Sequence, residues 1–427
     1  MNLLWGIGGV IGVLAIAFLL SSNRKAINWR TILIALALQM SFSFIVLRWD
    51  AGKAGLKHAA DGVQGLINFS YEGIKFVAGD LVNAKGPWGF VFFIQALLPI
   101  VFISSLVAIL YHFGIMQRFV SVVGGALSKL LGTSKAESLN SVTTVFLGQT
   151  EAPILIKPYL ARLTNSEFFA IMVSGMTAVA GSVLVGYAAM GIPLEHLLAA
   201  AIMAAPSSLL IAKFIMPETE KVDNNVELST EREDANVIDA AARGASEGMQ
   251  LVINVAAMLM AFIALIALLN GLLGLIGSLF DIKLSLDLIF GYLLSPFAIL
   301  IGVSPGEAVQ AASFIGQKLA INEFVAYANL GPHMAEFSDK TNLILTFAIC
   351  GFANFSSIAI QLGVTGTLAP TRRKQIAQLG IKAVIAGTLA NFLNAAVAGM
   401  MFLYNKAKSP LSKEGTLLYF IFSIYIK

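Results

Sequence analysis

Charged side chains are scarce in this chain. Asp, Glu, Lys and Arg make up 12% of its 427 residues, whereas about 25% is usual in soluble proteins. Apolar residues reach 57%, and the mean hydropathy is +0.82. So few charges cannot cover the surface of a water-soluble globule of this size, which excludes a soluble enzyme and a disordered chain. The composition indicates a polytopic membrane protein.

Several chemical signatures are also missing. The single cysteine, Cys350, excludes an internal disulfide framework and a cysteine-rich metal site. The four histidines are dispersed without the spacing that pairs ligands on a helix, so no metal site of that kind is predicted. The sequence has no Walker loop, HExxH motif or Ser-His-Asp pattern. We therefore expect no cofactor and no ATP use, and a transport function would need an ion gradient.

Long uncharged stretches predict the membrane spans, because a helix needs roughly 20 mostly apolar residues to cross the bilayer. We expect about eight transmembrane helices in an all-α fold, with an interfacial helix over residues 51–80. The first stretch lacks the basic start and cleavage site of a signal peptide, so we expect it to be retained. The stretches without Asp, Glu, Lys or Arg are 1–23, 31–47, 86–117, 168–194, 196–212, 248–280, 288–306, 341–371 and 383–405.

The short basic loops predict the orientation of the chain. Arg24, Lys25 and Arg30 follow the first span, and further basic groups precede the fourth span and the last. Placing all of them in the cytoplasm leaves both termini outside. This path also requires two segments that enter the membrane and return on the same side. The net charge of +4 is too small and scattered to indicate nucleic-acid binding.

Residues 136–160 and 288–328 are the two candidates for such re-entrant hairpins. Each is partly apolar but carries a carboxylate, Glu151 or Glu323. Broken backbone at membrane depth is tolerated only where protein or a water-filled cavity supplies partners. We therefore predict two helical hairpins, with the marginal stretch 288–306 as the entering arm of the second.

The two hairpins head a weak internal repeat. Gly148-Gln149 with Glu151 matches Gly316-Gln317 with Glu323. The distance from each glutamate to the next matched position is also similar, 32 residues to Val183 and 31 to Asn354. The assigned orientation makes this an inverted repeat, which many secondary transporters use to build a site at the middle of the membrane.

Polar residues at membrane depth are the functional candidates. An ionisable group at the helix centre costs at least about 2.5 kcal/mol, so Glu151 and Glu323 are site candidates by default. The alternative is that each pairs with a buried base, Lys157 or Lys318. Neutral polar groups can also join transmembrane helices without binding a ligand. The neutral candidates are Gln149, Thr150, Asn354, Ser356 and Ser357, with Phe352 as either a core ring or a ligand contact.

Three runs carry a resemblance to a known family: GQTEAP at 148–153, NEFVAY at 322–327 and CGFANFSSI at 350–358. In order and spacing they resemble the concentrative nucleoside transporters in their bacterial form, over roughly residues 1–403. The resemblance implies a homotrimer whose subunits have a scaffold part and a mobile transport part. It divides the chain into 1–117 (scaffold spans and interfacial helix), 118–217 (first repeat), 218–247 (charged cytoplasmic linker), 248–280 (scaffold span), 281–405 (second repeat) and 406–427 (an atypical tail).

The resemblance also implies the roles of the site residues. The nucleobase falls to Gln149, Thr150 and Glu151, with Val183 lining the pocket. The ribose hydroxyls fall to Glu323, Asn354 and Ser357, and Phe352 lies against the substrate. A sodium ion would sit near Thr144, Leu147, Ala178 and Val179.

Two of those ion positions differ from the family. Many members have Asn at the position of Thr144 and a hydroxyl residue at the position of Ala178. Thr177 and Ser182 could compensate, and some bacterial relatives use protons. The coupling ion is therefore sodium or a proton.

The resulting hypothesis is cation-coupled symport of nucleosides into the cell across the plasma membrane, by alternating access. The protein's partners are then the nucleoside, the lipid bilayer and two further copies of the chain. The alternatives are a carrier for free nucleobases or another small polar solute, a membrane-embedded enzyme using Glu151 and Glu323 as acid and base, and a channel.

Overall fold

The computed structural model describes residues 2–223, 234–279, 282 and 284–402, and over these residues the chain is helical without strands. The predicted atypical tail, 406–427, lies outside the described residues. The main α-helices are α1 (Asn2–Leu19), α2 (Trp29–Leu47), α3 (Asp50–Ala78), α4 (Pro99–His112), α5 (Ile115–Leu131), α6 (Lys135–Leu147), α7 (Lys157–Leu160), α8 (Asn165–Thr177), α9 (Gly181–Ala189), α10 (Leu194–Ile215), α11 (Val237–Ser278), α12 (Leu286–Leu300), α13 (Ala308–Ala320), α14 (Glu323–His333), α15 (Asp339–Ile349), α16 (Phe355–Gly363), α17 (Thr365–Leu368) and α18 (Arg373–Met401).

Local sequence signals explain where several helices begin. Ser134 and Thr164 each head a capping box, in which the side chain accepts from the backbone N–H three residues later and a glutamate there bonds back. These boxes start α6 and α8 inside the protein, where an unpaired N–H would be costly. Asn322 and Asn354 cap α14 and α16 in the same way, each accepting from a backbone N–H with its side-chain oxygen.

The same series of elements occurs twice. In the first half, α5 leads into a hairpin of α6 and α7, an interrupted helix of α8 and α9, and then α10. In the second half, α12 leads into a hairpin of α13 and α14, an interrupted helix of α15 and α16, and then α18. The central helices of the two series pack on one another, α8 and α10 against α18. The repeat expected from the hairpin motifs is therefore present as a structural repeat.

The second hairpin differs from the sequence prediction. Its arms are α13 and α14, residues 308–333, and residues 288–306 are not its entering arm. That apolar stretch belongs to α12, a separate helix that packs along α13, as α5 packs along α6. Its apolar composition reflects exposure on the outside of the helix bundle, where Tyr292 and Leu293 are both 65% exposed.

The charged linker is shorter than predicted. Residues 237–247 are the first three turns of α11. Their charge suggested a solvated loop, but Ala240, Gly244 and Gly248 recur at four-residue spacing and face α4. A Cβ on Gly244 would lie 2.6 Å from the Cβ of Ala108, so only small residues permit this close helix contact.

Six helices of the described chain are long and apolar enough to cross a membrane: Trp29–Leu47, Phe93–His112, Asn165–Ala189, Leu194–Ile215, Val237–Ser278 and Pro370–Met401. Three shorter apolar helices are Leu4–Leu19, Leu286–Leu300 and Phe355–Leu368. The segment predicted to be an interfacial helix, 51–80, is helical as α3, and its place at the interface stays a prediction.

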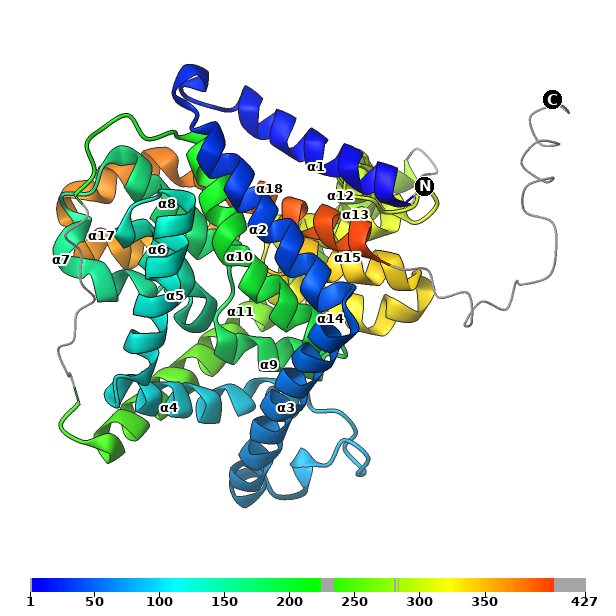
Figure 1. The fold of residues 1–427 in the computed structure, drawn as a ribbon. Helices are drawn as coiled ribbons and strands as arrows, with labels where there is room; N and C mark the ends of the chain where they lie inside the picture. Colours follow the sequence, from blue (N-terminus) through cyan, green and yellow to red (C-terminus); the bar gives the residue numbers. More distant parts are fainter. Residues whose placement is uncertain (1, 224–233, 280–281, 283, 403–427) are drawn as a thin grey trace, which may run out of the picture.

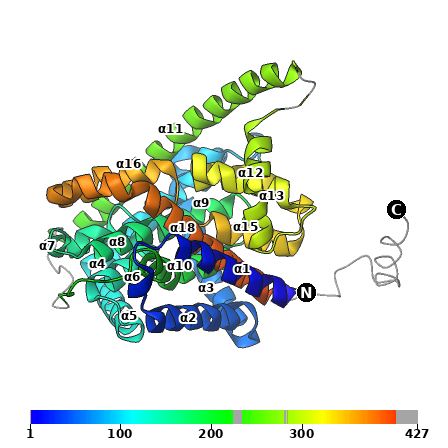
Figure 2. The same ribbon diagram turned by 90° about the horizontal axis from the view of Figure 1, so that it is seen from above.

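The hairpins, the interrupted helices, α10 and α18 form the buried centre of the molecule, and the other helices lie around them. In Figure 1, α1 lies along α18, while α3 and α4 lie at the lower edge. Figure 2 shows the C-terminal end of α11 projecting from the body of helices. This end carries many exposed leucines and isoleucines, including Leu268, Leu272 and Leu275, which suit a lipid environment.

Candidate functional site

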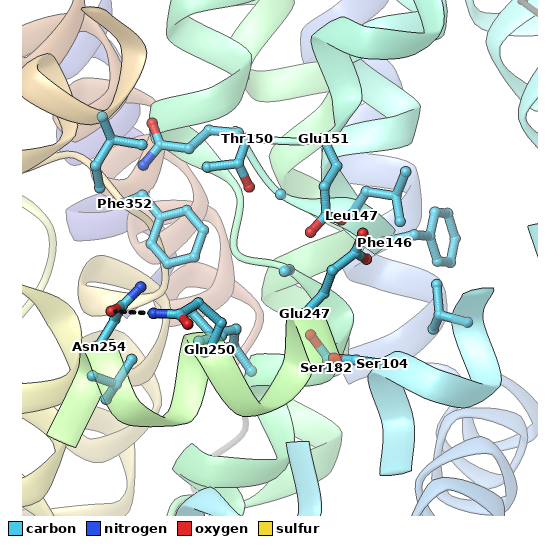
Figure 3. A pocket seen from close by; sticks show the side chains of 18 of the residues that line it. Ser104, Phe146, Leu147, Thr150, Glu151, Ser182, Glu247, Gln250, Asn254 and Phe352 are labelled. Atoms are coloured by element: carbon cyan, nitrogen blue, oxygen red, sulfur yellow. Dashed lines mark hydrogen bonds between the residues drawn. The ribbon is translucent and has the colours of Figure 1, made fainter. Parts of the chain in front are cut away.

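A cavity of about 560 Å³ lies between the two repeats on one side and α4 and α11 on the other. Ligand pockets in proteins usually measure about 300–1,000 Å³, so it is large enough for a small polar solute. All eight residues that the sequence assigned to the substrate line it: Gln149, Thr150, Glu151, Val183, Glu323, Phe352, Asn354 and Ser357. Figure 3 shows the Phe352 ring beside the cavity with Thr150 and Glu151 above it and α11 below.

The tip of the first hairpin is a tight turn. α6 ends at Leu147, and Gly148 follows with φ +79°, a left-handed conformation that favours glycine. A Cβ at Gly148 would lie 3.0 Å from the Cβ of Ala180, which belongs to the break between α8 and α9. The tip is thus seated against this break, and Gln149, Thr150 and Glu151 follow it directly.

Gln149 joins the first hairpin to the second repeat. Its Nε2 donates to Oγ of Ser357 at 3.0 Å, and its Oε1 accepts from Nε2 of Gln361 at 3.3 Å. Gln361 also donates to the carbonyl of Met172 at 2.9 Å. The Gln149 amide is therefore held in a defined orientation at the cavity wall. An amide can both donate to and accept from a solute, which suits the edge of a nucleobase or a similar ring.

Glu323 is the buried carboxylate of the second hairpin. It is the first residue of α14, after the cap Asn322. The hydroxyl of Tyr187 donates to its Oε1 at 3.0 Å, and Nδ2 of Asn354 donates to its Oε2 at 3.4 Å. A carboxylate has about four acceptor positions. Glu323 can therefore accept further hydrogen bonds from the hydroxyls of a solute in the cavity.

Asn354 is placed by the break in the second interrupted helix. α15 ends at Ile349, and α16 starts at Phe355 with Asn354 as its cap. The Oδ1 of Asn354 accepts from the backbone N–H of Ser357 at 3.0 Å and from Oγ of Ser356 at 2.7 Å. The cap fixes the amide, so its Nδ2 points at Glu323. The break therefore covers residues 350–354, and Phe355, Ser356 and Ser357 form the first turn of α16.

Glu151 faces a wall of the cavity that the sequence did not reveal. It points toward Glu247 of α11 (Figure 3). Arg243 lies one turn before Glu247 and donates to it at 2.9 Å, and it also binds Asp234 through two hydrogen bonds of 2.7 and 2.9 Å. These bonds hold the pKa of Asp234 below its usual range. The sequence missed this charged wall because its residues were assigned to a solvated linker.

Among the residues described, neither of the two site carboxylates, Glu151 and Glu323, forms an ion pair with an N–O distance up to 4.0 Å. The alternative that Lys157 and Lys318 neutralise them by direct contact is therefore wrong.

The positions expected for an ion lie behind the first hairpin tip. Thr144 is buried, and its hydroxyl donates to the carbonyl of Ser141 at 2.8 Å. The carbonyl of Ala178 accepts from the N–H of Phe352 at 3.4 Å. Leu147 borders the cavity, and Val179 is buried in the break. The hydroxyl oxygen of Thr144 and the carbonyl oxygen of Ala178 each keep a free lone pair. Such oxygen atoms are the ligands that a hard cation prefers.

One further polar group lies on the same helix. Asn140 is buried one turn before Thr144, and neither atom of its amide has a hydrogen-bond partner among the described residues. No group of three or more His, Cys, Asp and Glu that could hold a metal occurs in the described parts of the chain. The expected ion positions, Thr144, Leu147, Ala178 and Val179, offer only hydroxyl and carbonyl oxygens.

Tyr187 and Gln361 were also missed, and both bond to residues that line the cavity. Tyr187 is a buried aromatic in an apolar helix, and nothing in its neighbours distinguishes it from a core residue. Gln361 follows Ser357 by four residues, so a search for polar residues on one helix face could have found it.

The chain matches three family models that together cover most of its length. Residues 8–81 match "Na+ dependent nucleoside transporter N-terminus", 93–194 match "Nucleoside recognition", and 196–399 match "Na+ dependent nucleoside transporter C-terminus".

Curated relatives from bacteria and animals share this similarity. "Uncharacterized transporter YutK" of Bacillus subtilis is 54% identical over 404 residues, covering 94% of this chain and 100% of the relative. "Nucleoside permease NupC" of Helicobacter pylori is 45% identical over 412 residues, covering 94% and 98%. The human "Solute carrier family 28 member 3" is 36% identical over 414 residues, covering 92% of this chain and 59% of the human protein.

Solved structures have the same fold. CNTnw in an inward-facing substrate-bound state is 47% identical with a TM-score of 0.90, covering 94% of this chain and 98% of CNTnw. A variant of CNTnw in an outward-facing state is 47% identical with a TM-score of 0.91, covering 94% and 99%. Another variant of CNTnw was solved in three intermediate states.

Proposed function

Because this chain belongs to the family of sodium-dependent, concentrative nucleoside transporters, and is therefore a membrane carrier and not an enzyme, we propose that it imports nucleosides together with a cation. Import takes place across the cytoplasmic membrane, and the working unit is a homotrimer. The coupling ion is sodium or a proton. The embedded-enzyme hypothesis for Glu151 and Glu323 is abandoned.

The observation that carries the proposal is that polar groups from both hairpins line one cavity. Glu323 and Asn354 are bonded to each other, and a carboxylate and an amide suit the adjacent hydroxyls of a ribose. Gln149 comes from the first hairpin, and its amide suits a nucleobase. A nucleoside stripped of water would lose several kcal/mol without such partners, and both of its halves find them here.

The mechanism follows from how the cavity is bounded. Its inner wall comes from the hairpin tips and the helix breaks, and its outer wall comes from α4 and α11. If the two repeats move together past α4 and α11, the cavity changes its neighbours on the outer wall and opens to the other side. The known inward-facing, intermediate and outward-facing structures of CNTnw are consistent with such alternating access.

Coupling requires that the cation stabilises the state that binds the nucleoside. The first hairpin tip is the place for this, because Thr144 and Leu147 on α6 lie next to the break that contains Ala178 and Val179. A cation there would fix the tip and with it the neighbouring Gln149. Substrate and ion then bind with positive cooperativity, and each raises the affinity for the other by the same factor.

The test is uptake of labelled uridine into proteoliposomes under separately imposed sodium and proton gradients, with a panel of competing nucleosides. We expect accumulation above equilibrium under one of the two gradients, which a channel could not produce. Competition by uracil as strong as that by uridine would instead favour a nucleobase carrier. Uptake that neither gradient drives would contradict cation coupling. A separate measurement of the molecular mass of the purified protein checks that it is a trimer.

A further inference from the structure

A buried lysine lies on the second hairpin, outside the residues that line the cavity. Lys318 is on α13, and its side chain is 0% exposed. Its Nζ donates to Oδ1 of Asn391, on α18, at 3.1 Å. The ion pairs found over the described chain do not include Lys318. The carboxylate of Glu323 acts on Lys318 electrostatically from beyond ion-pair distance. A buried cation without a counter-ion in direct contact is costly, so its place in the structure requires a physical reason.

Asn391 connects this lysine to both interrupted helices. Its Nδ2 donates to the carbonyl of Thr177 at 2.9 Å and to the carbonyl of Cys350 at 3.0 Å. Thr177 is the last residue of α8, and Cys350 is the cap residue that follows α15. One amide therefore closes the broken ends of two helices, one from each repeat. The Oδ1 of Asn391 is then left to accept a hydrogen bond, which Nζ of Lys318 donates.

The junction leaves no spare space. A Cβ on Gly351 would lie 2.4 Å from Oδ1 of Asn391 and 2.6 Å from the carbonyl oxygen of Thr177. These contacts are far shorter than real Cβ atoms show, so residue 351 must be glycine for the amide to reach both carbonyls. The side chain of Asn391 therefore links the ends of α8 and α15 directly.

The electrostatics favour a positive charge at this junction. The last carbonyls of a helix have no partner within the helix, and they give its C-terminal end a partial negative charge. The ends of α8 and α15 meet at Asn391, so two such partial charges converge there. The ammonium of Lys318 is bound to the same amide and offsets them.

The repeat gives this lysine a counterpart. α13 in the second half corresponds to α6 in the first, and Lys318 lies two residues before the end of α13. The corresponding end of α6 carries Thr144 and Leu147, the expected ligands of a diffusible cation next to the break after α8. The same region of the two hairpins therefore carries a proposed ion site in one repeat and a covalently attached cation in the other.

We propose that Lys318 is a built-in cation of the second repeat, which holds the ends of α8 and α15 together through Asn391. It is a positioning residue: it fixes the segment from Gly351 to Asn354 that presents Phe352 and Asn354 to the cavity. The inference rests on the proposed function, because the positioned groups are those assigned to the nucleoside. The second repeat then needs no diffusible ion at this place.

The experiment measures uridine affinity by isothermal titration calorimetry on the purified full chain, with gel filtration as the check on folding. We expect Lys318→Met to weaken binding at least tenfold. Asn391→Asp should weaken it similarly, because the new carboxylate still pairs with Lys318 but cannot donate to the carbonyls of Thr177 and Cys350. The control Lys382→Met, a partly exposed lysine also on α18, should bind as the wild type does.

A rescue measurement separates a positioning cation from a general packing role. Methylammonium should restore at least part of the affinity of Lys318→Ala and none of that of Asn391→Asp. Wild-type affinity in Lys318→Met or Asn391→Asp, or no rescue by methylammonium, would overturn the inference. If Lys318→Met is not recovered as a single species, the Asn391→Asp titration decides. A wild-type protein that binds no nucleoside would instead contradict the proposed function.

Discussion

The hydroxyl of Tyr187 donates to Oε1 of Glu323 at 3.0 Å, although the two residues are 136 positions apart. Tyr187 belongs to α9, the helix after the break in the first repeat, and Glu323 begins α14 in the second hairpin. Both residues are buried. The bond therefore joins the two repeats beside the cavity and holds one oxygen of the carboxylate, which leaves the other positions of Glu323 for a solute.

Tyr187→Phe removes this bond while keeping the ring. Because a hydrogen bond to a charged group contributes about 1.5–3 kcal/mol, we expect the KM for uridine to rise roughly tenfold or more. Uptake kinetics in proteoliposomes measure it. Tyr292→Phe, at an exposed position on α12, is the matched control and should leave the KM unchanged. An unaltered KM in Tyr187→Phe would show that the tyrosine does not position Glu323.

Glu323→Gln tests the ribose assignment. The amide is nearly isosteric, but it loses the charge and one acceptor oxygen. We expect uptake of labelled uridine to fall at least a hundredfold, with an unchanged gel-filtration profile. Glu72→Gln, an exposed carboxyl on α3, should transport normally. Undiminished uptake in Glu323→Gln would remove this residue from the site.

Gln149→Ala tests the assignment of Gln149 to the nucleobase. The change removes the amide that bonds to Ser357 and Gln361. We expect the preference between purine and pyrimidine nucleosides to shift at least threefold, with a smaller change in maximal rate. Competition of a nucleoside panel against labelled uridine measures the preference, and Gln64→Ala on α3 is the control. An unchanged order of preference would count against a base-reading role.

Gly148→Ala tests the conformation of the first hairpin tip. The alanine would have to adopt φ +79°, and its Cβ would meet Ala180 at 3.0 Å. An alanine forced to φ > 0 costs more than roughly 0.4–1 kcal/mol, so we expect the melting temperature of the purified protein to fall by several degrees. Gly125→Ala, inside α5 with no atom within 4 Å of the new Cβ, should be neutral or stabilising. Equal melting temperatures for the two variants would show that the tip relaxes freely.

The prediction of the site from sequence worked where function requires an unusual local pattern. Glu151 and Glu323 stand out because carboxylates are rare in apolar segments, and the run from Asn354 to Ser357 stands out because it interrupts one. Tyr187 gave no such signal, since a tyrosine in an apolar helix has the same pattern whether it packs in the core or orients a carboxylate. Its role depends on which oxygen lies opposite its hydroxyl.

The errors in the fold have a common cause. Residues 237–247 are charged, and residues 288–306 are apolar, so composition assigned the first to a loop and the second to a hairpin arm. In the structure, the first is helical because the stripe of Ala240, Gly244 and Gly248 packs closely on α4. The second is an outer helix whose apolar surface is exposed. Composition reports the chemical surroundings of a segment and not its partner.

The sequence by itself determined the all-α membrane class, the two hairpins, the internal repeat and the polar residues that line the cavity. These follow from local properties, because hydropathy, glycine breaks and carboxylates in apolar runs act on a single segment. Only the tertiary structure decided the outer wall of the cavity on α11, the bond from Tyr187 to Glu323 and the junction of Lys318 with Asn391. These contacts join residues far apart in the chain, and their geometry depends on how the two repeats pack together.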